Sequence, residues 1–255
     1  MPTRMQTVRI NDQVLLLNDH DEATCYLVTG SERALLIDTA NGYVDMHAFC
    51  SALTDLPLTV VQTHGHCDHI YGNVYFEEAC LHPADNAVFD SHFAFPEVQK
   101  LFAKHALTPA RKVPLRTGEL FDLGGGLVLE VVPLAGHTAG SVGFLDRKHR
   151  ILFSGDGALP HLWMQLPESG SIALLLQTLL TLRREYGADF DHLLTGHGRA
   201  LVPAAVVDGL IRGCEQLLRG ERQADVPYRW FGGECLAHPD ELGVYDRIVY
   251  DETKL

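Results

Sequence analysis

Three histidines and one aspartate occur within six residues of this chain, directly after the apolar run Leu58–Val61. They are His64, His66, Asp68 and His69, and the chain has only 14 histidines in 255 residues. The apolar run predicts a buried strand, and polar groups left unpaired at its end would be costly to bury. The cluster therefore predicts a metal site at the end of a strand rather than a solvated turn.

The spacing of the cluster suggests how it binds metal. In an extended or tightly turning chain, residues i and i+2 share a face, so His64 and His66 can hold one ion together. Asp68 and His69 lie beyond the strand end and are expected to face a second ion. Cys67 is expected to point away and pack. A structural zinc site would recruit several thiolates, whereas imidazoles with a carboxylate favour an open, catalytic site.

Three later segments repeat the pattern of a strand, a glycine and a metal-capable residue. They are Gly136–Ser141 with His137, Phe153–Asp156, and Thr195–Gly198 with His197. Each alone is weak evidence, because a Gly-His pair is more often a turn than a ligand. Together with the first cluster they predict four loops that meet at one site.

Hydrophobic patterning predicts strands and helices around these loops, and the segment 84–112 reads as irregular with short helical pieces. Helices are expected near 44–53, 171–186 and 203–218. The predicted strands are Val8–Leu17, Thr24–Val28, Ala34–Asp38, Leu58–Val61, Glu119–Leu123, Leu127–Pro133, Ser141–Leu145, Arg150–Phe153 and His192–Leu194. With no evident linker, residues 1–255 are expected to form one domain, in which 221–255 is a C-terminal extension.

The ordered motifs THGHCDH, GHTAGSVGF, SGD and TGHG resemble those of the metallo-β-lactamase superfamily over roughly residues 10–200. The first, Thr63–Asn73, is similar to the THxHxDHxGGN motif of the glyoxalase II-like branch, with Tyr71 in place of the first motif glycine. The resemblance implies an α+β fold, a four-layer αββα sandwich with metals at one edge of its two sheets. The extension does not resemble the helical glutathione-binding domain of glyoxalase II.

The resemblance also implies a ligand set for two metal ions. His64, His66 and His137 would hold the first ion, Asp68, His69 and His197 the second, and Asp156 would bridge both. We expect two zinc ions, with iron or manganese as alternatives. Such ions, about 3.5–4 Å apart, would share a hydroxide nucleophile. Asp68 would orient it and carry a proton as a catalytic residue.

Composition and charge limit the classes of partner that we expect for this chain. The net charge is −13, with no basic cluster longer than Arg183-Arg184, which disfavours a nucleic-acid partner. The start Met1–Gln6 lacks the apolar core of a signal peptide, and the apolar stretches are too short to span a membrane. Six cysteines without a CxxC pair suggest reduced thiols. We therefore expect a cytoplasmic protein without a membrane partner, and the oligomeric state stays open.

The expected activity is hydrolysis of a small ester, thioester or lactone, so the expected partner is a small-molecule acyl substrate. A phosphodiesterase or nuclease of the same superfamily and a non-catalytic metal-binding domain are the alternatives. Tyr71, His161 and Trp163 are candidate substrate contacts. His161 and Trp163 are expected in a loop after Asp156 that overhangs the metals as an apolar wall, together with Leu159, Leu162 and Met164.

Overall fold

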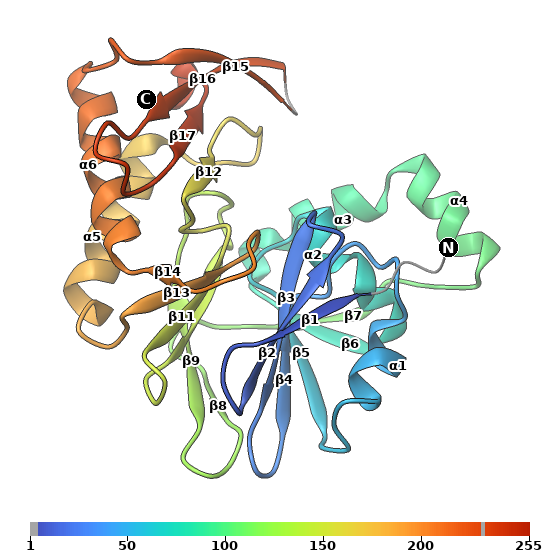
Figure 1. Cartoon of the computed structure of the whole chain (residues 1–255). Helices are drawn as coiled ribbons and strands as arrows, with labels where there is room; N and C mark the ends of the chain where they lie inside the picture. Colours follow the sequence, from blue (N-terminus) through green and yellow to red (C-terminus); the bar gives the residue numbers. More distant parts are fainter. Residues whose placement is uncertain (1–4, 231–232) are drawn as a thin grey trace.

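Two β-sheets pack face to face, and helices cover their outer faces (Figure 1). The computed structural model describes residues 5–230 and 233–255. Met1–Arg4, which carry most of the signal-peptide argument, therefore lie outside the described residues. The predicted α+β sandwich is confirmed. Among the described helices, none combines the length and apolar character that crossing a bilayer requires.

The first sheet has seven strands in sequential order from β1 to β7. Strands β1 to β4 pair antiparallel and β4 to β7 pair parallel. The predicted single strand Val8–Leu17 is wrong, because a turn in which Asn11 accepts from the Gln13 amide separates β1 from β2. The strands are β1 (Gln6–Arg9), β2 (Val14–Asp19), β3 (Ala23–Thr29), β4 (Ala34–Ile37), β5 (Leu58–Val61), β6 (Glu78–Leu81) and β7 (Arg111–Pro114).

Short helices connect the parallel strands of this sheet. α1 (Met46–Ser51) begins at Asp45, whose carboxylate accepts from the Ala48 amide. α2 (Cys67–Ile70) follows β5 and continues into the 3-10 turn η1 (Tyr71–Tyr75). The segment 84–112, expected to be irregular, contains the turn η2 (Pro83–Asp85) and two helices, α3 (Asn86–Phe93) and α4 (Pro96–Lys104).

The second sheet has the order β14-β13-β11-β10-β9-β8, and only the β11–β13 pair is parallel. Helices α5 (Ile172–Tyr186) and α6 (Ala205–Arg219) pack against its outer face. α5 is capped by Ser171, and α6 ends at left-handed Gly220. The strands are β8 (Leu120–Asp122), β9 (Val128–Pro133), β10 (Val142–Asp146), β11 (Ile151–Gly155), β13 (His192–Thr195) and β14 (Val202–Pro203).

The core between the two sheets is apolar and buried. It joins side chains of both sheets, among them Leu16, Val61, Phe144 and Phe153, all fully buried. Alternation along the strands turns these residues inward. This core fixes the two sheets against each other, and therefore fixes the loops at their shared edge.

A third sheet was not expected from the sequence. It has the order β12-β17-β16-β15 and joins the 221–255 extension to the segment after Asp156. The expectation that His161 and Trp163 lie in a loop is wrong, because both belong to β12, which pairs parallel with β17. The strands are β12 (His161–Trp163), β15 (Val226–Trp230), β16 (Gly233–Pro239) and β17 (Arg247–Tyr250).

Candidate metal centre

Four loops carry the seven predicted ligands to one edge of the sandwich. Strands β9, β11 and β13 run in the same direction, so the loops that follow them meet at one edge. His137 follows β9, Asp156 directly follows β11, and His197 follows β13. His64 and His66 come from the loop after β5, and Asp68 and His69 from the first turn of α2. The predicted convergence of the motifs is therefore observed.

His64, His66 and His137 form a compact group. The His66 Nδ1 atom lies 3.0 Å from His64 Nε2 and 2.9 Å from His137 Nε2. Tetrahedral donors about 2.0–2.1 Å from a zinc ion lie roughly 3.3 Å from one another. All three residues are buried. The three nitrogens therefore have the spacing of donors around one ion.

Asp68, His69 and His197 form a second group, and Asp156 lies between the two. Asp68 Oδ2 is 3.5 Å from His197 Nε2 and 3.6 Å from His69 Nε2. Asp156 Oδ2 lies 3.1 Å from His197 Nε2 and 3.7 Å from His137 Nε2, so it faces both groups. Asp156 therefore lies within reach of donor nitrogens from both groups.

Four of the histidines have a hydrogen-bond partner at the ring nitrogen that faces away from the site. His69 Nδ1 donates to Asp38 Oδ2 at 2.9 Å, and His64 Nδ1 lies 3.0 Å from the Thr63 hydroxyl. The outward nitrogens of His137 and His197 lie 2.7 Å from the backbone carbonyls of Trp163 and Glu22. Such outer partners set the tautomer and turn the other nitrogen toward a metal.

The carboxylates make the site attractive to cations. Burial opposes protonation of His69, but Asp68, Asp156 and Asp38 outweigh it and raise the pKa of His69 to about 10. Burial also opposes ionisation of Asp156, yet His197 and His69 hold its pKa well below the usual value. A metal ion can replace these imidazole protons, so binding there would release protons.

Two histidines of the first group have lowered rather than raised pKa values. Burial lowers the pKa of His137 to about 4 and that of His64 well below its ordinary value. Both rings are therefore neutral at physiological pH, which is the state that ligates metals.

Two buried polar atoms bear on whether metal ions fit between these residues. His69 Nε2 and Asp156 Oδ1 lie 3.7 Å apart and have no hydrogen-bond partner, although both are inaccessible to solvent. Buried polar atoms without partners are rare because they are costly. The donor set of imidazoles and carboxylates, with these two atoms aimed inward, fits divalent metal ions.

The family assignment rests on the sequence match. A family model described as the metallo-beta-lactamase superfamily matches residues 19–197, which include all seven residues. The chain belongs to the metallo-β-lactamase superfamily. Its predicted placement in the glyoxalase II-like branch stays a prediction.

Curated relatives of this metallo-β-lactamase-superfamily chain share one name. The chain is 32% identical over 159 residues to the acyl-coenzyme A thioesterase MBLAC2 of Gallus gallus, covering 53% of this chain and 57% of that protein. It is 28% identical over 165 residues to the protein of the same name of Homo sapiens, covering 53% and 58%. The matched region thus spans little more than half the length of these relatives.

Solved structures show the same fold at low identity. A metallo-beta-lactamase from Pontibacter korlensis aligns with a TM-score of 0.63 at 18% identity, covering 83% of this chain and 99% of that one. A sec-alkylsulfatase from Pseudomonas sp. aligns with a TM-score of 0.66 at 12% identity, covering 85% and 42%. At these identities the likeness concerns the fold alone.

The third sheet of this superfamily member supplies an aromatic wall beside the second group. The Trp163 ring stands edge-on to the His197 ring, with centroids 5.4 Å apart. The hydroxyl of Tyr228, on β15, lies 3.1 Å from His161 Nε2 and 3.4 Å from Trp163 Nε1. His161 also binds Asp246 at 2.7 Å. His161 and Trp163 are thus placed beside the site, whereas Tyr228 was missed.

Tyr71 packs against residues of helices α3 and α4. Its hydroxyl donates to the backbone carbonyl of His92 at 3.0 Å, and its ring packs against Phe93 and Phe102. Its role as a substrate contact stays a prediction.

Several residues around the metal centre carried no recognisable signal in the sequence. Buried Asp85 accepts from the backbone amides of Gly65 and Gly140, and so joins the first two motif loops. Glu168 lies 2.7 Å from His66 Nε2. The His92 ring lies 5.4 Å from that of His66. Lone acidic and histidine residues in loops have many roles, so no local pattern identifies these.

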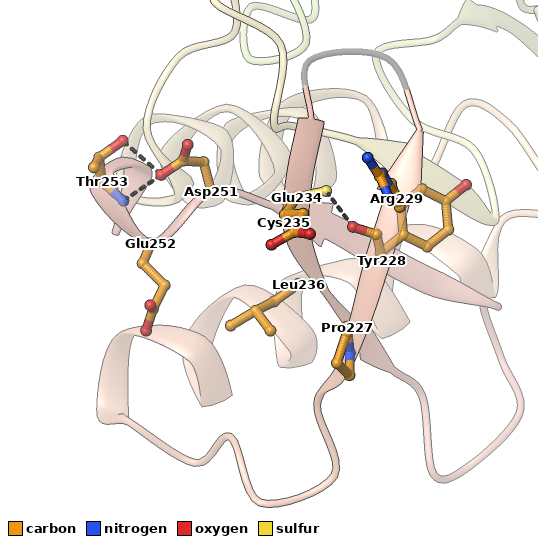
Figure 2. Close-up of a pocket in the computed structure, with 9 residues that line it drawn as sticks. All are labelled: Pro227, Tyr228, Arg229, Glu234, Cys235, Leu236, Asp251, Glu252 and Thr253. Atoms are coloured by element: carbon orange, nitrogen blue, oxygen red, sulfur yellow. Dashed lines mark hydrogen bonds between the residues drawn. The ribbon is translucent and has the colours of Figure 1, made fainter.

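A separate hollow of about 640 Å³ lies on the third sheet, lined by residues of β15 and β16 and around the turn after β17 (Figure 2). It contains none of the predicted ligands. Its lining mixes Arg229 with Glu234, Asp251 and Glu252, and we assign it no role in the chemistry of the metal centre.

Proposed function

We propose that this protein is a metal-dependent hydrolase that cleaves a small acyl compound, with a thioester as its preferred substrate. The observation that carries the proposal is the convergence of seven donor side chains, with His69 Nε2 and Asp156 Oδ1 buried and unpaired. Superfamily membership and the thioesterase name of the curated relatives support hydrolysis and the acyl class.

The proposed ligands follow the two groups. His64, His66 and His137 would hold one ion, Asp68, His69 and His197 another, and Asp156 would face both. Zinc is the proposed metal because imidazole and carboxylate donors in near-tetrahedral spacing suit it. Metal ions there would supply an activated water at neutral pH and positive charge against the developing oxyanion.

Asp68 is the proposed catalytic carboxylate. Its side chain is 27% exposed, compared with 4% for Asp156, so Asp68 borders the opening of the site. From this position one oxygen can orient the attacking water, and the carboxyl group can later deliver a proton to the leaving thiol. Cleavage consumes one water and yields a carboxylic acid and a thiol.

The aromatic wall is the proposed acyl contact. Trp163 is partly exposed beside His197, and His161 and Tyr228 continue the surface toward β15. An aromatic surface suits an acyl chain better than a polyanion. The net charge of −13 also opposes binding of phosphate backbones.

The test compares substrates on one zinc-loaded preparation. We expect kcat/KM for short acyl thioesters to exceed that for lactones, bis(p-nitrophenyl) phosphate and RNA. Asp156→Ala and His66→Ala should abolish turnover while circular dichroism stays native, because the core between the sheets does not include them. Efficient phosphodiester or RNA cleavage without acyl activity would contradict the proposal, as would near-normal activity of either variant.

A further inference from the structure

Glu168 is placed to control the orientation of His66. Its Oε1 atom lies 2.7 Å from His66 Nε2, while the other ring nitrogen, Nδ1, faces His64 and His137. An ionised carboxylate accepts from N–H, so this contact keeps the proton on Nε2 and leaves Nδ1 free as a donor to metal. A carboxylate behind a histidine ligand also increases the basicity of the ligand.

The loop that carries Glu168 has little regular structure of its own. It connects β12 to α5, and its backbone hydrogen bonds run from Met164 to Val249, from Ser169 to Leu166 and from Gly170 to Gly136. Such a loop positions a side chain only when other groups hold it.

Lys254 provides that support. Its Nζ atom donates to the carbonyls of Leu166 at 3.0 Å, Pro167 at 3.2 Å and Ser169 at 2.5 Å. An ammonium group has three donors, and here all three are directed at carbonyls on either side of Glu168. Lys254 thereby fixes the turn that aims the carboxylate.

Lys254 is itself held in place by the end of the third sheet. It closes the 3-10 turn η3 (Glu252–Lys254), which Asp251 caps by accepting from the amide and hydroxyl of Thr253 (Figure 2). This turn follows β17, and β17 pairs with β12, the strand that leads into the Glu168 loop. Both ends of the contact therefore originate in the same sheet.

We infer that Glu168 and Lys254 are positioning residues for the first metal ion: Lys254 holds the loop, Glu168 holds His66, and His66 presents Nδ1 to the ion. The inference rests on the proposed ligand role of His66, but it concerns metal affinity rather than the substrate. It also gives the 221–255 extension a function at His66, which lies far earlier in the sequence.

The experiment measures zinc affinity by competition with a chelator, together with cobalt(II) absorption spectra as a report on ligand geometry. Glu168→Ala should weaken binding of one ion about 10–100-fold, as loss of such outer partners typically does. Glu168→Gln should weaken binding less, since its oxygen still accepts the bond without the charge. Lys254→Met should also weaken this ion and alter the cobalt spectrum.

Arg222→Ala is the matched control. Arg222 pairs with Glu252 in the same turn at 2.9 Å, and this pair is not among the bonds that hold the Glu168 loop, so its removal should leave metal affinity unchanged. Unchanged affinity in Glu168→Ala would overturn the inference. An equal loss in Arg222→Ala and Lys254→Met would overturn the role of Lys254.

A different result would make Glu168 a ligand. His66, His92 and Glu168 lie close enough to hold an ion themselves, and His92 Nδ1 is buried without a partner. Loss of a whole ion at saturating zinc in both Glu168→Ala and His92→Ala would therefore replace positioning by direct coordination.

If the wild-type protein binds no metal, the proposed function fails with the inference. If affinity responds as expected but no acyl substrate is cleaved, only the proposed function fails.

Discussion

Replacement of Gly196 by alanine tests the metal centre with a single methyl group. Gly196 does not adopt the left-handed backbone conformation, so alanine fits its dihedral angles. The added Cβ, however, would lie 2.6 Å from His69 Cε1 and closer still to Asp156 Oδ1. Carbon atoms in good contact are about 3.5–4.0 Å apart, so His69 or Asp156 has to move by about 1 Å.

A displacement of this size exceeds what a metal site tolerates, because ligand distances are held to within about 0.2 Å. We expect Gly196→Ala to lose the ion held by His69, or to bind it much more weakly. Since misplacement by about 1 Å can cost about 100-fold in rate, kcat/KM should fall at least that far. The crowding itself should cost about 1–3 kcal/mol of stability.

The assay combines zinc stoichiometry by elemental analysis, kcat/KM on the best thioester and thermal unfolding. Gly118→Ala is the control, because Gly118 has a φ of 80° and open space around the added Cβ. The left-handed strain there should cost about 1–2 kcal/mol without affecting metal or turnover. If Gly196→Ala retains both ions and wild-type kinetics, then His69 and Asp156 do not coordinate metal in this geometry.

Two further predictions follow from the same geometry. Removal of zinc by a chelator should lower the melting temperature. Zinc at about 1,000 times Kd adds about 4 kcal/mol to the free energy of unfolding, which corresponds to about 8–16 °C for a chain of this size. An unchanged melting curve would contradict a metal site that couples four loops. Trp163→Ala should raise KM for long acyl thioesters more than for acetyl thioesters, because only a long chain reaches the aromatic wall. Leu120→Ala serves as the control, since Leu120 is an exposed residue on β8. Equal effects on both chain lengths would argue against the wall as the acyl contact.

The sequence determined the candidate ligands because each follows a local pattern. A buried strand, a glycine and a metal-capable residue are neighbours in the chain, and parallel strands bring such endings to one edge of a sheet. The order of the motifs was enough to predict the superfamily and the sandwich. What the sequence predicted less well were element boundaries, such as the turn between β1 and β2, where apolar residues on both sides concealed the break.

Only the tertiary structure decided how the ligands are held. Glu168 and His66 are 102 residues apart, and Asp38 and His69 are 31 apart, so no local spacing relates them. Glu168 and Asp38 are ordinary carboxylates in the sequence. Each acquires its role only when packing brings it to an imidazole nitrogen. The third sheet could not be predicted for the same reason, because β12 and β17 pair although they lie far apart in the sequence. Chemistry encoded by neighbouring residues could be predicted from sequence, whereas chemistry encoded by distant contacts required the fold.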